Sequence, residues 1–188
     1  MSAIFLDRDG VIMRKAPEGA YVRDWSEVDF LPGAVEAIAS FCSFGYKLIV
    51  VTNQRGVATG QIQPSKLRDI HTRMREVILK AGGDVLGIYC CTHDKSDNCT
   101  CRKPRPGMLL RAASEHQLYL PDCWIVGDTA TDIAAGKSVR CRTALITATR
   151  EHKDWIDKPD ICARSLKLVA REILRAERRI QICDLAKR

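Results

Sequence analysis

Residues 4 to 10 of the chain read Ile4-Phe5-Leu6-Asp7-Arg8-Asp9-Gly10. The apolar run that ends at Leu6 predicts a buried parallel strand whose carboxyl end opens into a site. Two carboxylates one residue apart repel each other and lose solvation when buried, so Asp7 and Asp9 indicate a bound cation. Gly10 permits a sharp turn and a close approach to a ligand. A strand followed by an ordinary polar turn explains the same stretch, and only the rest of the chain distinguishes the two.

The composition is typical of one globular domain with a buried core, since 46% of the 188 residues are hydrophobic. No basic region precedes the first strand as in a signal peptide, and no apolar run approaches membrane-spanning length. We therefore expect a cytoplasmic protein, monomeric and not membrane-bound. In that compartment the nine cysteines indicate reduced thiols or metal ligands. The formal net charge of +7 favours an anionic partner, either nucleic acid or a small phosphorylated substrate.

Strand and helix patterns alternate along the chain. Apolar runs predict further strands at residues 47–52, 85–90, 123–126 and 142–147. Helical patterns begin at Pro32-Gly33, run from Ser65 as N-cap to about residue 80, and run from residue 107 to about residue 115. A basic amphipathic segment at about residues 165–182 predicts a terminal helix packed on the sheet. The alternation predicts a single α/β domain over residues 1–188, with a parallel sheet covered by helices on both faces.

Polar residues recur where these strands end. Thr52 closes the second strand, Arg102 and Lys103 follow the third, and Asp128 follows the fourth. Ligands of parallel sheets collect outside the carboxyl ends of the strands, and carboxylates with a hydroxyl and an ammonium indicate Mg²⁺ and phosphate. His71 stands alone on the predicted helix, and we interpret it as an ordinary surface or boundary histidine remote from the strand ends.

Residues 91–101 carry a second, separate pattern. Three thiols and an imidazole, from Cys91, His93, Cys99 and Cys101, match the ligands of a closed Cys₃His zinc site. Four protein ligands leave no open position for water, so the predicted Zn²⁺ is structural. The alternative is a cluster of free thiols, which would be liable to oxidation.

With these residues in view, the chain resembles the haloacid dehalogenase (HAD) superfamily of phosphotransferases. The matching motifs are Asp7-Arg8-Asp9-Gly10, Thr52, Lys103, and Gly127-Asp128 with Asp132. The segment Cys91-x-His93…Cys99-x-Cys101-Arg102-Lys103-Pro104 is similar to the zinc-bearing branch of histidinol-phosphate and heptose-bisphosphate phosphatases. The resemblance covers roughly residues 3 to 150. It implies a Rossmann-like HAD fold with a small zinc-binding loop and no separate cap domain.

The resemblance also implies roles for individual residues. Asp7 would attack phosphorus and form an aspartyl-phosphate, while Asp9 would protonate the leaving oxygen and then activate water. Asp7, the backbone carbonyl of Asp9, and Asp128 would hold Mg²⁺. Thr52, Asn53 and Lys103 would hold the transferring oxygens. The residues implied in substrate binding are Asn53, Gln54, Arg55, Arg102, Lys103 and Thr129.

Within this branch the resemblance favours the heptose enzymes. The motifs similar to those of the heptose enzymes are Leu31-Pro32-Gly33-Ala34, Thr52-Asn53-Gln54-x-Gly56-Val57-Ala58-x-Gly60 and Lys103-Pro104-x-Pro106-Gly107-Met108. They imply removal of the C7 phosphate of D-glycero-D-manno-heptose 1,7-bisphosphate, giving a heptose 1-phosphate for nucleotide-heptose and lipopolysaccharide precursor synthesis. Charge favours the same choice, because Lys103 can bind the transferring phosphate and other cations the distal one. Candidates for the distal phosphate are Arg102, Arg55, Arg14 and Lys15.

Two alternatives remain open at this point. Histidinol phosphate is the competing substrate, and its amine and imidazole would need acidic partners. A zinc-stabilised nucleic-acid-binding module would account for the net charge and the metal loop. That module leaves the strand-end carboxylates unexplained, since carboxylates repel a phosphate backbone.

Overall fold

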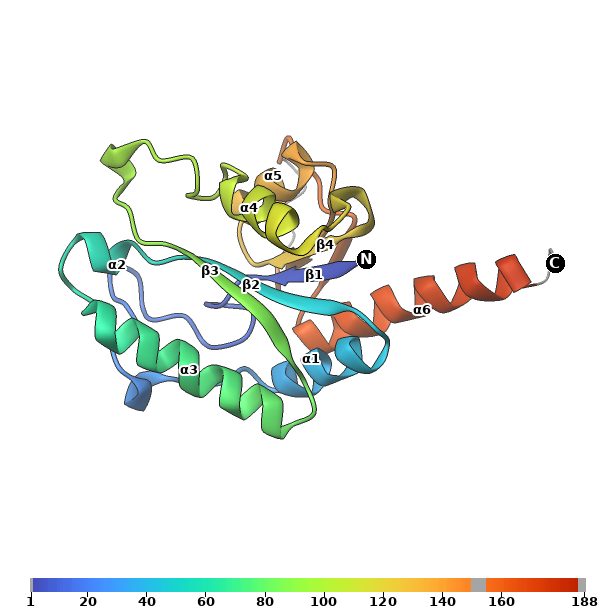
Figure 1. Ribbon diagram of the computed structural model, residues 1–188, viewed down its shortest axis with the longest axis horizontal. Helices are drawn as coiled ribbons and strands as arrows, with labels where there is room; N and C mark the ends of the chain where they lie inside the picture. The colour runs from blue at the N-terminus through green and yellow to red at the C-terminus, as the bar shows by residue number, and fades with distance from the viewer. Residues whose placement is uncertain (1, 150–154, 186–188) are drawn as a thin grey trace.

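The computed structural model describes residues 2–149 and 155–185 (Figure 1). Its strands form one parallel sheet in the order β3-β2-β1-β4-β5-β6. The strands are β1 (Ala3–Leu6), β2 (Lys47–Asn53), β3 (Val85–Cys91), β4 (Trp124–Gly127), β5 (Arg142–Ile146) and β6 (Ile161–Ala163). The α-helices are α1 (Ala34–Ser43), α2 (Arg55–Ala58), α3 (Pro64–Lys80), α4 (Gly107–His116), α5 (Ala130–Ser138) and α6 (Leu166–Leu185). Short 3₁₀ turns are η1 (Trp25–Glu27), η2 (Lys95–Asp97) and η3 (Leu120–Asp122).

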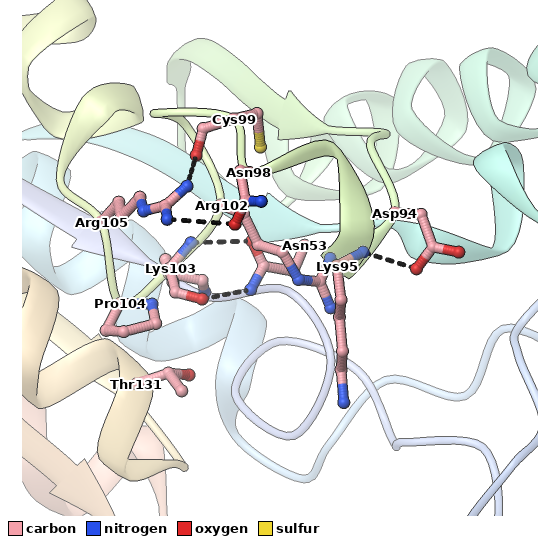
Figure 2. A pocket seen from close by; sticks show the side chains of 10 residues that line it. All are labelled: Asn53, Asp94, Lys95, Asn98, Cys99, Arg102, Lys103, Pro104, Arg105 and Thr131. Atoms are coloured by element: carbon pink, nitrogen blue, oxygen red, sulfur yellow. Dashed lines mark hydrogen bonds between the residues drawn. The ribbon is translucent and has the colours of Figure 1, made fainter.

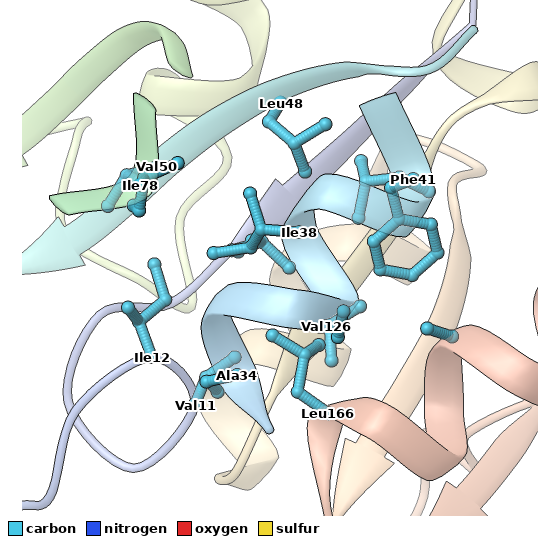
Figure 3. Close-up of a cluster of buried hydrophobic side chains, with 14 of the residues drawn as sticks. Val11, Ile12, Ala34, Ile38, Phe41, Leu48, Val50, Ile78, Val126 and Leu166 are labelled. Carbon is cyan, nitrogen blue, oxygen red and sulfur yellow. The ribbon is translucent and has the colours of Figure 1, made fainter. Parts of the chain in front are cut away.

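The predicted α/β architecture is confirmed, because helices cover both faces of the sheet. Successive side chains of a strand point to opposite faces, so Ile4 and Leu6 join one apolar cluster and Phe5 joins the other. The first cluster packs the sheet against α1, α3 and α6, and Figure 3 shows Ile38 and Phe41 of α1 within it. The second packs it against α4 and α5. Each large apolar side chain buried in this way stabilises the fold by about 1.5–3 kcal/mol.

Helix α3 begins two residues earlier than the sequence indicates. Pro64 occupies its first turn and Gln63 is the N-cap, with no hydrogen bond from the cap side chain. The prediction of Ser65 as N-cap is therefore wrong. Proline has the helical φ already set and has no N–H to satisfy at the first position, so Pro64 starts the helix itself.

The terminal helix packs on the sheet as expected. Leu166, Val169 and Ile173 of α6 are buried in the first cluster, against α1. Figure 1 shows the helix running on past the sheet toward its C-terminal end. Over residues 2–149 and 155–185, none of the helices has both the length and the apolar content needed to cross a bilayer.

The strand register brings the polar strand ends together. Leu6 pairs with Val50 on one side and with Val126 on the other. The residues after these positions therefore leave the sheet at the same edge, and the Asp7 N–H donates to the carbonyl of Val126 at 2.9 Å. This edge carries the candidate site. That residues 1–188 form a single domain stays a prediction.

Candidate active site

Lys103 lies buried at the centre of the site. Its Nζ is 3.0 Å from Asp7 Oδ1 and 2.6 Å from Asp132 Oδ1, and it donates to the carbonyl of Val51 at 2.9 Å. Burial opposes the charged ammonium, yet the two ion pairs raise the pKa of Lys103 above its ordinary value. A buried ammonium is thus held beside the first aspartate of the Asp-x-Asp motif.

Three carboxylates form a possible metal site around this ammonium. Oxygens of Asp7, Asp128 and Asp132 all lie within 4.8 Å of one another. Burial raises the pKa of Asp7 to about 7, although the charge of Lys103 acts in the opposite direction. Asp128 Oδ1 is buried with no hydrogen-bond partner among the described residues, and Asp128 Oδ2 pairs with the Lys15 ammonium. Carboxylate oxygens without enough donors are the ligands that Mg²⁺ takes, so the cluster fits that cation.

The Asp9 side chain is not part of this cluster and is held by Arg8 and Gln54. Arg8 Nε donates to Asp9 Oδ2 and Arg8 Nη2 to Asp9 Oδ1, each at 3.1 Å. The Gln54 amide donates at 2.8 Å both to Asp9 Oδ2 and to Thr52 Oγ1. Gln54, expected from the sequence to bind substrate, is buried, and its amide nitrogen donates to Asp9 and Thr52.

Two other residues expected to bind substrate also bond within the protein. The Asn53 side chain donates to the Lys103 carbonyl at 3.2 Å and accepts from the Lys103 N–H at 3.1 Å, which ties the loop after β3 to the end of β2. Thr129 is the N-cap of α5, and its Oγ1 donates to Asp132 Oδ2 at 2.6 Å. Both residues therefore hold Lys103 and its partner in place.

A cavity of about 440 Å³ adjoins Lys103 (Figure 2). Its cationic lining comes from Lys95, Arg102, Lys103 and Arg105. Arg102 Nη1 is buried with no hydrogen-bond partner among the described residues. Arg55 does not line this cavity and instead pairs with Asp94, with Nε 2.5 Å from Oδ1. The cavity is suited to an anion, and Arg102 brings a buried, unbonded nitrogen to its lining.

The thiols and imidazole of the loop at 91–101 converge. The Sγ atoms of Cys91 and Cys99 are 3.6 Å apart, as are those of Cys99 and Cys101. His93 Nδ1 is 3.7 Å from Cys91 Sγ and 3.2 Å from Cys101 Sγ. A tetrahedral zinc ion with bonds of about 2.3 Å to sulfur separates its sulfurs by roughly 3.7 Å. The donor types and their spacing therefore fit Zn²⁺.

Two contacts of the site, made by Asp132 and His71, were not predicted from the sequence. Asp132 stands in the acidic motif, but no pattern assigns it to Lys103. His71 is partly buried, and its Nε2 lies 3.2 Å from Arg8 Nη1, beside the Asp9 pair. The interpretation of His71 as a histidine remote from the strand ends is wrong, because its imidazole contacts Arg8, two residues after the end of β1. No sequence spacing would have revealed either contact.

Known proteins are similar to this chain in both sequence and fold. A family model described as "HAD-hyrolase-like" matches residues 100–169. A protein of Pseudomonas putida named D-glycero-beta-D-manno-heptose-1,7-bisphosphate 7-phosphatase is 34% identical over 177 residues, covering 93% of this chain and 100% of the relative. A Helicobacter pylori protein of the same name is 34% identical over 162 residues, covering 84% of this chain and 92% of the relative.

A solved structure extends the comparison. The crystal structure of D,D-heptose 1.7-bisphosphate phosphatase from B. bronchiseptica, complexed with magnesium and phosphate, aligns with a TM-score of 0.82 and 30% identity. The alignment covers 94% of this chain and 99% of that one. The likeness therefore spans the whole sheet together with the candidate site.

Proposed function

The chain belongs to the heptose-1,7-bisphosphate 7-phosphatase family of the HAD superfamily, and on that premise we propose that it hydrolyses the C7 phosphate of D-glycero-β-D-manno-heptose 1,7-bisphosphate. The observation that carries the proposal is the buried Lys103 ammonium, paired with Asp7 and Asp132 and opening into a cationic cavity. The product, a heptose 1-phosphate, would serve nucleotide-heptose synthesis in the cytoplasm. The β anomer follows the names of the relatives.

The chemistry begins at Asp7. One carboxylate oxygen of Asp7 attacks phosphorus, and the bond from phosphorus to the C7 oxygen breaks as the aspartyl-phosphate forms. Asp9 gives its carboxyl proton to the departing C7 oxygen. Asp9 then takes a proton from water, the water oxygen bonds to phosphorus, and Asp7 is released.

The residues around these carboxylates stabilise the charge that develops. Lys103 lies within 3.0 Å of the attacking carboxylate and is placed to bind a transferring oxygen. Thr52 supplies a buried hydroxyl at the end of β2, aligned by Gln54. Mg²⁺ held by Asp7, Asp128 and the backbone carbonyl of Asp9 would reduce the repulsion between nucleophile and phosphate. Zn²⁺ held by Cys91, His93, Cys99 and Cys101 would brace the loop that leads into Arg102 and Lys103.

The distal phosphate fits the cavity beside Lys103. Arg102, Arg105 and Lys95 line it, and a guanidinium with unsatisfied N–H groups binds phosphate well. Other distal-phosphate candidates have partners already, since Arg14 pairs with Asp29 and Lys15 with Asp128. The carboxylate in the cavity lining, Asp94, is held by Arg55, which leaves little to attract the amine of histidinol phosphate.

Phosphate release by Asp7→Asn tests the proposal. The substitution keeps the size of the side chain and removes the nucleophile, so Mg²⁺-dependent release should fall by about 10⁴-fold or more. Asp69→Asn is the matched control, because Asp69 carries an exposed ion pair with Arg73 on helix α3. Full turnover by the Asp7 variant would contradict the proposal.

A further inference from the structure

Arg8 is an unusually buried cation whose bonds are directed at one catalytic group. Its side chain is 1% exposed, and a buried guanidinium is costly unless its N–H groups are bonded. Nε and Nη2 both reach the Asp9 carboxylate, and Nη1 reaches His71 Nε2 at 3.2 Å. The backbone N–H of Arg8 also donates to Asp7 Oδ1 at 2.7 Å. Arg8 thus links both aspartates of the motif.

The remaining nitrogen of the guanidinium, Nη1, is hydrogen-bonded to His71. Arginine only donates hydrogen bonds, so Nε2 of His71 accepts and the ring proton resides on Nδ1. Burial, reinforced by the nearby charge of Arg8, lowers the pKa of His71 to about 4. The imidazole is therefore neutral at physiological pH, as an acceptor must be. Helix α3, packed through Ile70 and Met74, fixes its position.

We propose that His71 is a positioning residue for the general acid: through Arg8 it fixes the orientation in which Asp9 exchanges its proton with the C7 oxygen. The inference rests on the proposed function. Without an acceptor at position 71, Arg8 Nη1 is buried and unbonded, and the guanidinium gains by rotating toward another partner. That rotation breaks the two-pronged contact with Asp9 while leaving Asp7, Lys103 and Thr52 in place.

The dependence on the leaving group separates this role from a merely structural one. A sugar alkoxide needs a proton to depart, whereas p-nitrophenolate leaves without one. We expect His71→Leu to lower kcat/KM for the heptose bisphosphate by about tenfold or more and that for p-nitrophenyl phosphate by less than about twofold. His71→Gln, whose amide oxygen can accept from Arg8, should restore most of the loss. His116→Leu is the control, since His116 lies on α4 against Tyr89.

Two results would overturn the inference: equal loss on both substrates, or loss on neither. If the leucine variant unfolds, Arg8→Lys gives the same test. It keeps the positive charge but removes the pair of N–H groups that bond both oxygens of Asp9. Its loss must again be confined to the sugar substrate. A wild-type protein that hydrolyses neither substrate would instead refute the proposed function itself.

Discussion

Replacing Lys103 with methionine keeps most of the side-chain length and removes the ammonium from between two carboxylates. The Asp132 side chain is fully buried and that of Asp7 is 13% exposed, so both would lose their main counter-charge. Removing one partner of a buried ion pair costs about 3–5 kcal/mol. In a protein of this size each 1 kcal/mol lowers the melting temperature by roughly 2–4 °C, so a fall of about 10 °C is expected.

The same variant should be sensitive to pH in a defined direction. Burial already raises the pKa of Asp7 to about 7, and loss of Lys103 raises it further. An acid whose pKa is raised by folding destabilises the native state increasingly as the pH rises from its unfolded pKa, and this penalty levels off above its folded pKa. The penalty of Asp7 therefore levels off near pH 7 in the wild type but continues to grow above pH 7 in the variant, whereas below pH 7 it is the same in both. The gap in melting temperature between wild type and variant should therefore be wider at about pH 8 than at about pH 5.5.

Lys137→Met is the matched control for calorimetry on metal-free protein. Lys137 also bonds an aspartate, Asp160, at 2.7 Å, but the two side chains are 30% and 42% exposed. Such a pair contributes less than about 1 kcal/mol. Equal melting temperatures for the Lys103 and Lys137 variants would refute the reasoning, because the buried pair would then stabilise no more than the exposed one.

Three further outcomes follow from the structure. Removing zinc with a chelator should expose the thiols of residues 91–101 to alkylation and lower activity; elemental analysis that finds no zinc would contradict the assignment. Gly10→Ala should weaken Mg²⁺ binding in a calorimetric titration, because Gly10 has a φ of +85° and an added Cβ would collide with the Asp128 carboxylate. As the pH falls from 6.5 to about 4, the free energy of unfolding in urea should decrease by up to about 3 kcal/mol more for the wild type than for His71→Gln. The reason is that His71 binds a proton in the unfolded state at a higher pH than in the native state. Parallel pH profiles for the two proteins would contradict this expectation.

The main outline of the fold could be predicted because each buried strand is a short apolar run ending in polar residues. Predicted strand ends lie within one residue of those observed, as for β2 and β4. Strand β6 and helices α2 and α5 were not predicted. Strand β6 and helix α2 have three and four residues, which is too few to show a period. The Ser65 cap failed since a proline one position earlier starts the helix.

Only part of the candidate site could be predicted from the sequence. Asp7, Asp128 and Lys103 could be placed at one edge because parallel strand ends share that edge. Spacing along the chain cannot show that the Gln54 amide bonds to Asp9 or that the His71 ring accepts from Arg8. Those contacts depend on how α3 packs against the sheet. The family resemblance implied substrate binding for Asn53 and Thr129, whose side chains bond to Lys103 and Asp132.

The central claim is most directly tested by comparing kcat/KM for both anomers of the heptose 1,7-bisphosphate with that for histidinol phosphate, with Mg²⁺ present. We expect that the β-bisphosphate is preferred, that one phosphate is released per sugar, and that phosphorus NMR finds the remaining phosphate at C1. A preference for histidinol phosphate of tenfold or more, roughly 1.4 kcal/mol of transition-state stabilisation, would contradict it.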